Sequence, residues 1–314
     1  MDGKINKAAQ YGTRFERIIG NDIQNIEIQF LKAYDFLPEL AMHFGSYIAK
    51  KSFIRQTTTA NGIENGISFH FYKIFENDSQ TSSRRKIKKY NETSYVRVFP
   101  VAISQKILFT KNTQITHLSV AISTDYLKSF LREEAKHFQF LFDNSNIFLI
   151  EEIMTDDILR TVNDIVKEEQ PYSLKSYHYK IKAMELLFYL FQSLSKREKS
   201  VYQKLSESDI KSIYKVRDRI VSSLDKPNSI ETLKQLACMN ELKMRKIFKQ
   251  VFGMGIYDYY QHQRMKEAAR LLRDEKLSVS EAGYQMGFEN LSHFTRVFEK
   301  HIGKKPKKYS NEFI

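Results

Sequence analysis

The chain has 314 residues, of which 42% are hydrophobic, so it is long enough for two ordinary domains with buried cores. The formal net charge is +13, and the single cysteine, Cys238, excludes a disulfide framework and a cysteine-rich zinc site. No apolar run reaches the roughly 18 residues of a membrane span, and the first residues are too polar for a signal peptide. We therefore expect a soluble cytoplasmic protein.

The positive charge is concentrated in the C-terminal third of the chain. Residues 201–314 carry 22 Lys and Arg against 14 Asp and Glu, a net of +8, whereas the first 200 residues carry 28 against 23. Such a density favours a polyanion, such as the phosphate backbone of DNA, as the partner. A basic surface that only keeps the protein soluble is the alternative that charge alone leaves open.

A β-sheet domain is predicted before residue 123. Residues 1–60 show only a partial alternation and a short amphipathic stretch. The clearest strand pattern is residues 67–72, where Ile, Phe and Phe alternate with Ser, His and Tyr and so lie on the opposite face. Short strands with polar turns indicate a small sheet domain, here a partly open barrel. Further strands are predicted at residues 95–99, 105–109 and 115–122, with a basic hairpin or loop at 79–89.

Helices are predicted in the second half of this domain. Asp125 can cap the first of them, because its carboxylate can accept the free N–H groups of the first turn. The helix over 174–194 carries a wide apolar stripe that can pack on the sheet or pair with a second copy of the chain; we favour a homodimer through 174–194. The charged run 196–199 is predicted to link domains 1–200 and 201–314. The helices are expected over 125–131, 156–168 and 174–194.

A helix-turn-helix is predicted in the C-terminal domain. Ser229 caps one short helix, the turn Cys238-Met239-Asn240 leads into another, and Gly253 stops that helix in a left-handed conformation. Two short helices joined by so tight a turn are typical of a helix-turn-helix, whose second helix enters the major groove of DNA. The helices of this domain are expected to begin at Ser208 or Asp209 and to span 230–237, 242–252, 256–272, 279–286 and 291–302.

The helices over 242–252 and 291–302 are two copies of one pattern. When the two segments are aligned with an offset of about fifty residues, Lys246 corresponds to Arg296 and Gly253 to Gly303. Each helix has an apolar face and a facing stripe of basic and polar side chains. The helix between them is about 25 Å long at about 1.5 Å per residue, of the order of one DNA turn, so it can hold both in successive grooves.

Several motifs occur at fixed spacing in this domain. They are FKQVFG at 248–253, Tyr260 followed by RMKEAARLL at 264–272, GF at 287–288 with SHFTRVF at 292–298, and GKKP at 303–306. In this order and spacing they resemble the AraC/XylS family of transcription regulators, over residues 213–309. The resemblance implies an α+β protein: a variable, often cupin-like β-domain followed by helices, then an all-α domain with two helix-turn-helix units joined by a long helix.

The resemblance also assigns the residues that face DNA. Arg245 and Arg296 can each form two hydrogen bonds with a guanine edge, whereas Lys246 and Lys249 are better suited to phosphates. The alternative for each is a solvated helix face. The matching positions, with neighbours, are Leu242, Lys243, Arg245, Lys246 and Lys249 in the first helix and Leu291, Ser292, His293, Thr295 and Arg296 in the second.

Two pairs of residues depart from the family pattern. Lys234 and Gly283 occupy equivalent positions in the supporting helices, where the family usually has a small residue. Glycine there weakens helix propensity by about 1 kcal/mol, and lysine must extend to the surface. Leu242 and Leu291 make the candidate reading faces less polar, so they can contact thymine methyl groups or neighbouring side chains. These departures bear on which DNA sequence the protein recognises, and they do not change the class of protein that the motifs indicate.

The N-terminal domain is expected to sense a small molecule or to dimerise, as the resemblance implies, and no motif identifies its ligand. His70 and His117 are not part of a clustered ligand pattern, so no metal and no cofactor is expected. The resemblance favours a transcription activator that contacts RNA polymerase.

The sequence also bears on two other classes of function. We find no nucleophile elbow, no phosphate-binding loop and no Cys/His nucleophile, so no enzyme is expected. A methyl-accepting repair cysteine, which some members of the family carry, is not expected, because Cys238 is predicted in the helix-turn-helix turn. A non-specific architectural DNA-binding protein is the remaining alternative.

Overall fold

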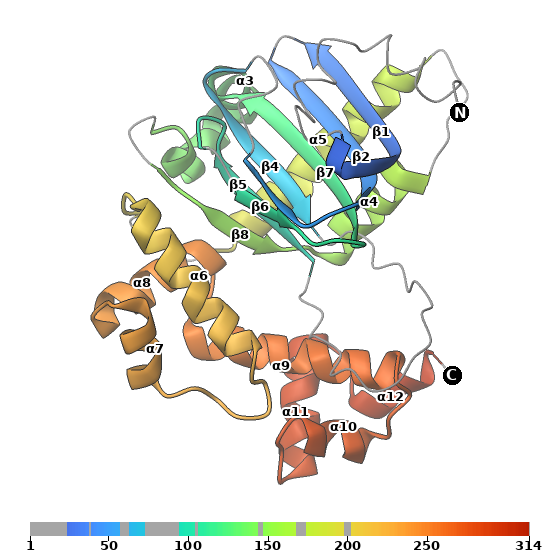
Figure 1. The fold of residues 1–314 in the computed structure, drawn as a ribbon, viewed down its shortest axis with the longest axis vertical. Coiled ribbons are helices and arrows are strands. Elements are labelled where there is room, and N and C mark those ends of the chain that lie inside the picture. The colour runs from blue at the N-terminus through green and yellow to red at the C-terminus, as the bar shows by residue number, and fades with distance from the viewer. Residues whose placement is uncertain are drawn as a thin grey trace. The chain divides into compact units, whose positions relative to one another are not determined.

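The protein divides into two compact units in the computed structural model (Figure 1). The described residues up to Lys204 form the first unit and those from Leu205 form the second. The basic segment 79–89 and the second half of the predicted 196–199 linker, residues 198 and 199, lie outside the described residues. Within the part of the chain that is described, no helix has the length and apolar character needed to cross a bilayer. The described residues are 24–37, 39–56, 63–72, 94–103, 106–143, 147–167, 174–197 and 202–313.

The first unit is built on a six-stranded antiparallel sheet in the order β1-β2-β7-β4-β5-β8. A second, two-stranded sheet pairs β3 with β6. The strands that the alternating pattern predicted are all present, and a β-sheet domain followed by a helical domain is confirmed. The bounds are β1 (Ile26–Leu37), β2 (Leu40–Ala49), β3 (Phe53–Gln56), β4 (Gly66–Tyr72), β5 (Tyr95–Pro100), β6 (Lys106–Phe109), β7 (Gln114–Ser123) and β8 (Ile150–Ile153).

The long strand β1 had no clear sequence pattern. Its pairing with β2 shifts register between Ile28 and Phe30 and again between Asp35 and Leu37. Each shift inserts an extra residue and breaks the period of two that marks a strand in sequence. The strand therefore pairs with β2 along its length, but the two shifts interrupt both the register and the hydrophobic pattern.

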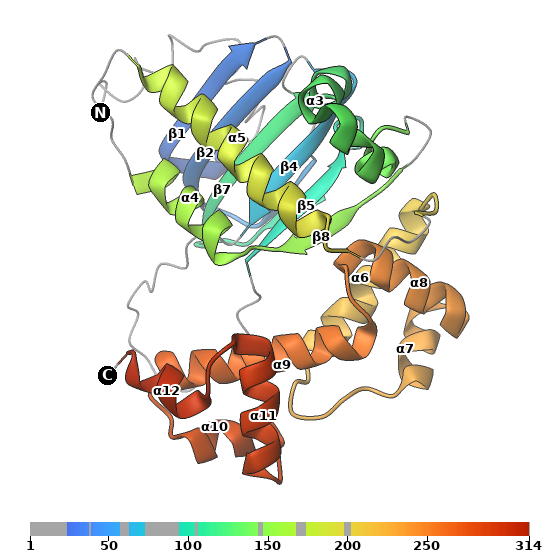
Figure 2. The same cartoon turned by 180° about the vertical axis from the view of Figure 1, so that it is seen from behind.

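Helices cover one face of the sheet (Figure 2). The predicted inward residues of β4, Ile67, Phe69 and Phe71, are buried in a core that also contains Leu186 and Leu190 of α5. The α5 helix crosses the sheet from β1 to β8. The helices are α3 (Thr124–Leu131), a 3₁₀ segment η2 (Arg132–Leu141), α4 (Asp156–Lys167) and α5 (Lys175–Leu194).

Two predicted helix starts differ from the structure by one or two residues. The N-cap of α3 is Ser123 rather than Asp125, and its hydroxyl accepts a hydrogen bond from the N–H of Tyr126. A capping residue needs extended backbone, which Ser123 has as the last residue of β7, whereas Asp125 is already helical. Likewise α6 begins after Ser206, and Asp209 completes a capping box with it.

The second unit is helical and has one hydrophobic core. Ser229, Asn240 and Ser278 cap their helices with side-chain oxygens, and Gly253 and Gly303 end theirs with positive φ values of 77° and 81°, so the predicted boundaries are largely confirmed. The helices are α6 (Glu207–Val221), α7 (Ile230–Ala237), α8 (Glu241–Phe252), α9 (Ile256–Arg273), α10 (Val279–Gln285), α11 (Leu291–Ile302) and α12 (Pro306–Asn311).

Candidate nucleic-acid interface

The first helix pair consists of α7 and α8 joined by a tight turn. Cys238 ends α7 in a left-handed conformation, with φ 53° and ψ 41°, and Asn240 caps α8 by accepting a hydrogen bond from the N–H of Lys243 at 2.8 Å. One face of α8 packs into the core through Met244, Ile247, Phe248 and Val251. The opposite face is exposed and carries all five predicted residues: Leu242, Lys243, Arg245, Lys246 and Lys249.

Two of the cations on α8 are held by acidic neighbours. The ammonium of Lys243 lies 2.7 Å from a carboxylate oxygen of Asp209 on α6, and Nε of Arg245 lies 2.7 Å from a carboxylate oxygen of Glu241. Burial raises the pKa of Asp209, but hydrogen bonds from Lys243 and Ser206 outweigh burial and lower the pKa below its usual value. Part of the positive charge on α8 is therefore neutralised within the protein.

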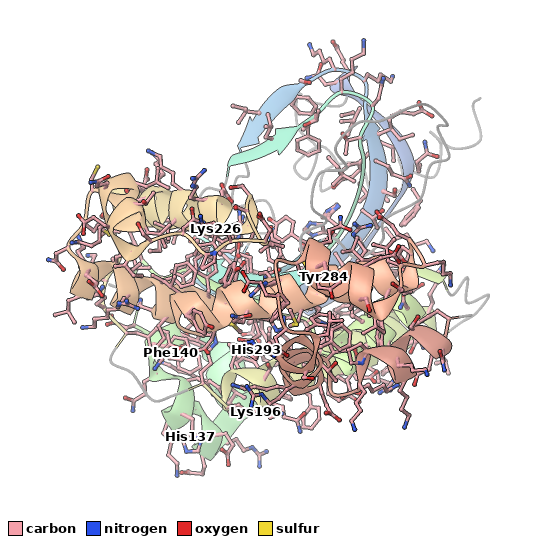
Figure 3. The ribbon with its side chains drawn as sticks, turned by 90° about the horizontal axis from the view of Figure 1, so that it is seen from below. His137, Phe140, Lys196, Lys226, Tyr284 and His293 are labelled. Carbon is pink, nitrogen blue, oxygen red and sulfur yellow. The ribbon has the colours of Figure 1, made fainter. Side chains whose placement is uncertain are left out.

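The second helix pair consists of α10 and α11. The turn between them passes through Gly287, at φ 71°, and Asn290 caps α11 by accepting a hydrogen bond from the N–H of His293 at 2.9 Å. His293, labelled in Figure 3, lies in the first turn of α11 and its ring contacts Phe288 at a centroid distance of 5.6 Å. Phe294 and Phe298 anchor the opposite face of α11 in the core.

The predicted residues of α11 differ in exposure. Ser292, His293 and Arg296 are exposed, whereas Leu291 and Thr295 are half-buried. Among the residues that the structure describes, Arg296 forms no hydrogen bond or ion pair, so its guanidinium is available to a ligand. The structure thus brings the predicted residues together on two helix faces. Lys243 and Arg245 are paired with carboxylates of the protein, whereas Arg296 is not paired with any in the described part of the chain.

The packing of Leu291 explains the glycine that departs from the family pattern. Gly283 on α10 is buried, and a Cβ built there would lie 2.8 Å from Leu291 Cδ2 and 3.2 Å from Phe294 Cδ1. The glycine weakens helix propensity, but its missing side chain lets α11 approach α10 closely. Lys234, the equivalent residue on α7, extends to the surface as expected, where its ammonium lies 2.8 Å from Glu231 and that ion pair raises the pKa of Lys234.

Comparison with known proteins identifies the C-terminal domain. A family model described as a helix-turn-helix domain matches residues 233–312. PchR, a regulatory protein of Pseudomonas aeruginosa, is 35% identical over 99 residues, which are 31% of this chain and 33% of PchR. RhaR, a transcriptional activator of Escherichia coli, is 28% identical over 126 residues, which are 40% of this chain and 45% of RhaR. Residues 233–312 form an AraC-type helix-turn-helix domain.

Solved structures of AraC-type proteins are similar in sequence to about a third of this chain. A probable AraC family regulator from Rhodopseudomonas palustris is 26% identical and covers 32% of this chain and 96% of its own, with a TM-score of 0.30. The DNA-binding domain of AdpA, solved in complex with a target DNA, is 24% identical and covers 32% of this chain and 92% of its own, with a TM-score of 0.31. The chain spans between a third and a half of the length of PchR and RhaR.

Two acidic residues of the second unit, Asp209 and Glu241, were not among the predicted site residues. Glu241 precedes Arg245 by four residues, a spacing at which opposite charges meet on one helix face, so the sequence did contain a signal for that pair. Asp209 pairs with Lys243 from a different helix, and no short-range pattern indicates such a contact. Both residues decide how much of the charge on α8 is open to a polyanion.

Proposed function

We propose that the protein is a sequence-specific DNA-binding transcription regulator of the cytoplasm, in which α7–α8 and α10–α11 are two helix-turn-helix units joined by α9. The observation that carries the proposal is Arg296, an exposed arginine without an intramolecular partner among the described residues, on a helix whose other face is anchored by Phe294 and Phe298. An unpaired guanidinium on a rigid helix suits recognition of a guanine edge.

The length of α9 supports binding of both units to one face of the duplex. It has 18 residues, which at about 1.5 Å per residue makes it roughly 27 Å long. That length suits recognition helices in successive major grooves, which lie about 34 Å apart. In this proposal Arg296, Arg245, Ser292, His293 and Thr295 contact base edges, Leu242 and Leu291 contact thymine methyl groups or support the helices, and Lys243, Lys246 and Lys249 bind phosphates.

Selection of bound duplexes from a random pool tests this proposal. A regulator should enrich a motif with two parts about one helical turn apart. Absence of any enriched motif would favour the alternative, a non-specific architectural DNA-binding protein, for which the net charge of +8 on residues 201–314 is the supporting observation. Mapping of bound sites in the native genome would then show which genes are controlled.

The first unit is proposed to be a cupin-like sensor of a small-molecule effector. On the sheet face opposite the helices, one cross-strand row is polar on five strands, from β2 to β8, and ends at Ala33 on β1. It includes a hydrogen bond between Ser119 and His43 at 2.6 Å and an ion pair between Arg97 and Glu151 at 2.7 Å. Hydrogen-bonding groups on one sheet face suit an organic ligand with polar substituents. The row runs His43, Ser119, His70, Arg97 and Glu151 across β2, β7, β4, β5 and β8.

Activation through RNA polymerase completes the proposed function, and transcription in a purified system with a mapped promoter would test it. Activation that appears only with a compound made or used by the neighbouring genes would identify the effector. Replacing His43 and Ser119 by Ala should then abolish the response while leaving DNA binding intact. A double variant that still responds would contradict the sensor assignment.

A homodimer through 174–194 is also proposed. Leu174, the N-cap residue of α5, and Tyr177, Ile181 and Phe188 on α5 are each more than half exposed. Their spacings of three, four and seven residues match the seam of a two-stranded coiled coil. A second copy of the same helix presents the same spacing, as a two-fold interface requires. Sedimentation should show a dimer for the wild-type chain and a monomer for Ile181→Glu, with Gln192→Glu on the same helix as the control.

A further inference from the structure

A buried arginine at the middle of α9 contacts the turn of the second helix pair. Arg264 is almost fully buried, and its Nε donates a hydrogen bond to the backbone carbonyl of Met286 at 2.7 Å. Its guanidinium also lies over the ring of Phe288, 3.7 Å from the centroid. Met286 and Phe288 flank Gly287, the residue at which the chain turns between α10 and α11. Arg264 therefore holds this turn against α9.

The same turn touches the first half of the domain. A Cβ built on Gly287 would lie 2.1 Å from the carbonyl oxygen of Asp225, so the two backbones are in direct contact. Asp225 belongs to the loop between α6 and α7, and Tyr260 donates a hydrogen bond from its hydroxyl to the carbonyl of Leu224 in that loop at 3.0 Å. Tyr260 lies one turn before Arg264 on α9, and the guanidinium is 5.5 Å from the Tyr260 ring.

The two halves of the domain thus meet at one place. On adjacent turns of α9, Tyr260 binds the loop that precedes α7, and Arg264 binds the turn that precedes α11. Arg264 gains its contacts from a carbonyl and aromatic rings rather than from a carboxylate, and burial lowers its pKa. Only a planar guanidinium can donate this hydrogen bond and stack on Phe288 at the same time, which a lysine cannot do.

We propose that Arg264 is a positioning residue that sets the distance and angle between α8 and α11, and so the spacing of the two DNA half-sites that the protein accepts. The inference rests on the proposed function, because it assumes that both helices enter DNA. Consecutive base pairs are rotated by about 34° and separated by about 3.4 Å, so a rigid pair of helices fits one spacing and a loosened pair fits several.

The binding experiment uses the full chain and the duplex motif enriched by it. Inserting one base pair between the half-sites should weaken wild-type binding by about tenfold or more. For Arg264→Met the penalty should fall to about twofold, while affinity for a single half-site stays within about twofold of wild type. The control is Arg273→Met, at the end of the same helix, whose guanidinium pairs with Asp274 at the surface. An unchanged spacing profile, or an equal loss on half-site and full site, would overturn the inference.

A measurement without DNA separates this inference from the proposed function. Cys238, the single cysteine, is exposed in the α7–α8 turn, and Lys300 is exposed near the end of α11, so spin labels on Cys238 and on Lys300→Cys report the distance between the two helix pairs. We expect a narrow distance distribution in the otherwise wild-type protein and a distribution about twice as wide with Arg264→Met, since the constraint on the turn is then lost.

The same spin-label measurement keeps the inference testable where the Met variant fails to fold. Arg264→Lys and Tyr260→Phe each remove one part of the contact while keeping most of the side chain. Both variants should widen the distance distribution between the two spin labels, as Arg264→Met does. Equal distributions in the wild type and the folded variants would overturn the inference even if the protein binds DNA specifically. A wild-type protein that enriches no motif would instead contradict the proposed function alone.

Discussion

The helices α8 and α11 occupy equivalent places in the repeat but present different chemistry. On α8, Lys243 and Arg245 are paired with Asp209 and Glu241, whereas Arg296 on α11 has no such partner among the described residues. The difference arises from the surroundings, since α6 packs beside α8 and supplies one of the two carboxylates. A duplicated sequence pattern therefore does not imply a duplicated function, and we expect α8 to contribute more to phosphate binding and α11 more to base recognition.

The largest expected effect is that of Arg296→Ala. Removing the unpaired guanidinium should cost about 1–3 kcal/mol of binding free energy on the specific site and relax base preference at one position. Titration of specific and random duplexes measures both quantities. The matched variant on α8, Lys246→Ala, should weaken binding to both duplexes equally. An equal loss for Arg296→Ala as well would show that this residue contacts phosphate and would remove the proposed difference between the helices.

Substitutions at equivalent positions of the supporting helices α10 and α7 should change the free energy of unfolding by different amounts. Gly283→Ala places a methyl group against Leu291 and Phe294 and should lower the free energy of unfolding by about 1–3 kcal/mol. Lys234→Ala, at the equivalent position of α7, loses only a surface ion pair and should change stability by less than about 0.5 kcal/mol. Denaturant unfolding measures both values. Equal effects would show that the two helix pairs pack alike.

Acid should destabilise the domain through a histidine that packs beside α11. Burial, with the nearby charges of Lys266 and His301, lowers the pKa of His262 on α9 to about 4. In the unfolded chain this pKa is about 6.5, so the unfolded state binds the extra proton and stability falls as the pH drops through 6.5 towards 4. At pH 5 the loss should be about 2 kcal/mol relative to pH 8.

Unfolding of the wild type and of His262→Leu at both pH values tests the assignment to this histidine. The leucine variant should lose less stability in acid, because it has no imidazole to protonate. A variant that keeps the full acid loss would place the responsible group elsewhere in the domain.

The smallest expected effect is a gain in affinity for DNA. Asp209→Asn removes the carboxylate that holds Lys243 but keeps an oxygen to accept the hydrogen bond from Ser206 N–H. The freed lysine should strengthen DNA binding by less than about 1 kcal/mol and steepen the salt dependence by about one unit of slope. The control is Asp218→Asn, because in the wild type the Asp218 carboxylate pairs with Arg217. An unchanged salt slope would mean that Lys243 does not reach phosphate.

Local chemistry explains which parts of the fold were predictable. The helix start at Ser229 and the stop at Gly253 were predicted because each depends on residues within one turn of the helix end. The strand β4 was predicted because its alternation is unbroken, whereas β1 was missed because two register shifts interrupt the alternation. The cap at Asp125 was wrong because the backbone of β7 extends as far as Ser123, a fact that depends on strand pairing.

The sequence by itself determined the repeated helices and their exposed basic faces, because helical periodicity, caps and glycine stops are encoded within a few neighbouring residues. Only the tertiary structure decided which cations remain open to DNA and how the two helix pairs are joined. Lys243 meets Asp209 across 34 positions of the chain, and Arg264 meets Met286 across 22. Contacts between such distant residues follow from the packing of the helices around α9, which no local pattern records.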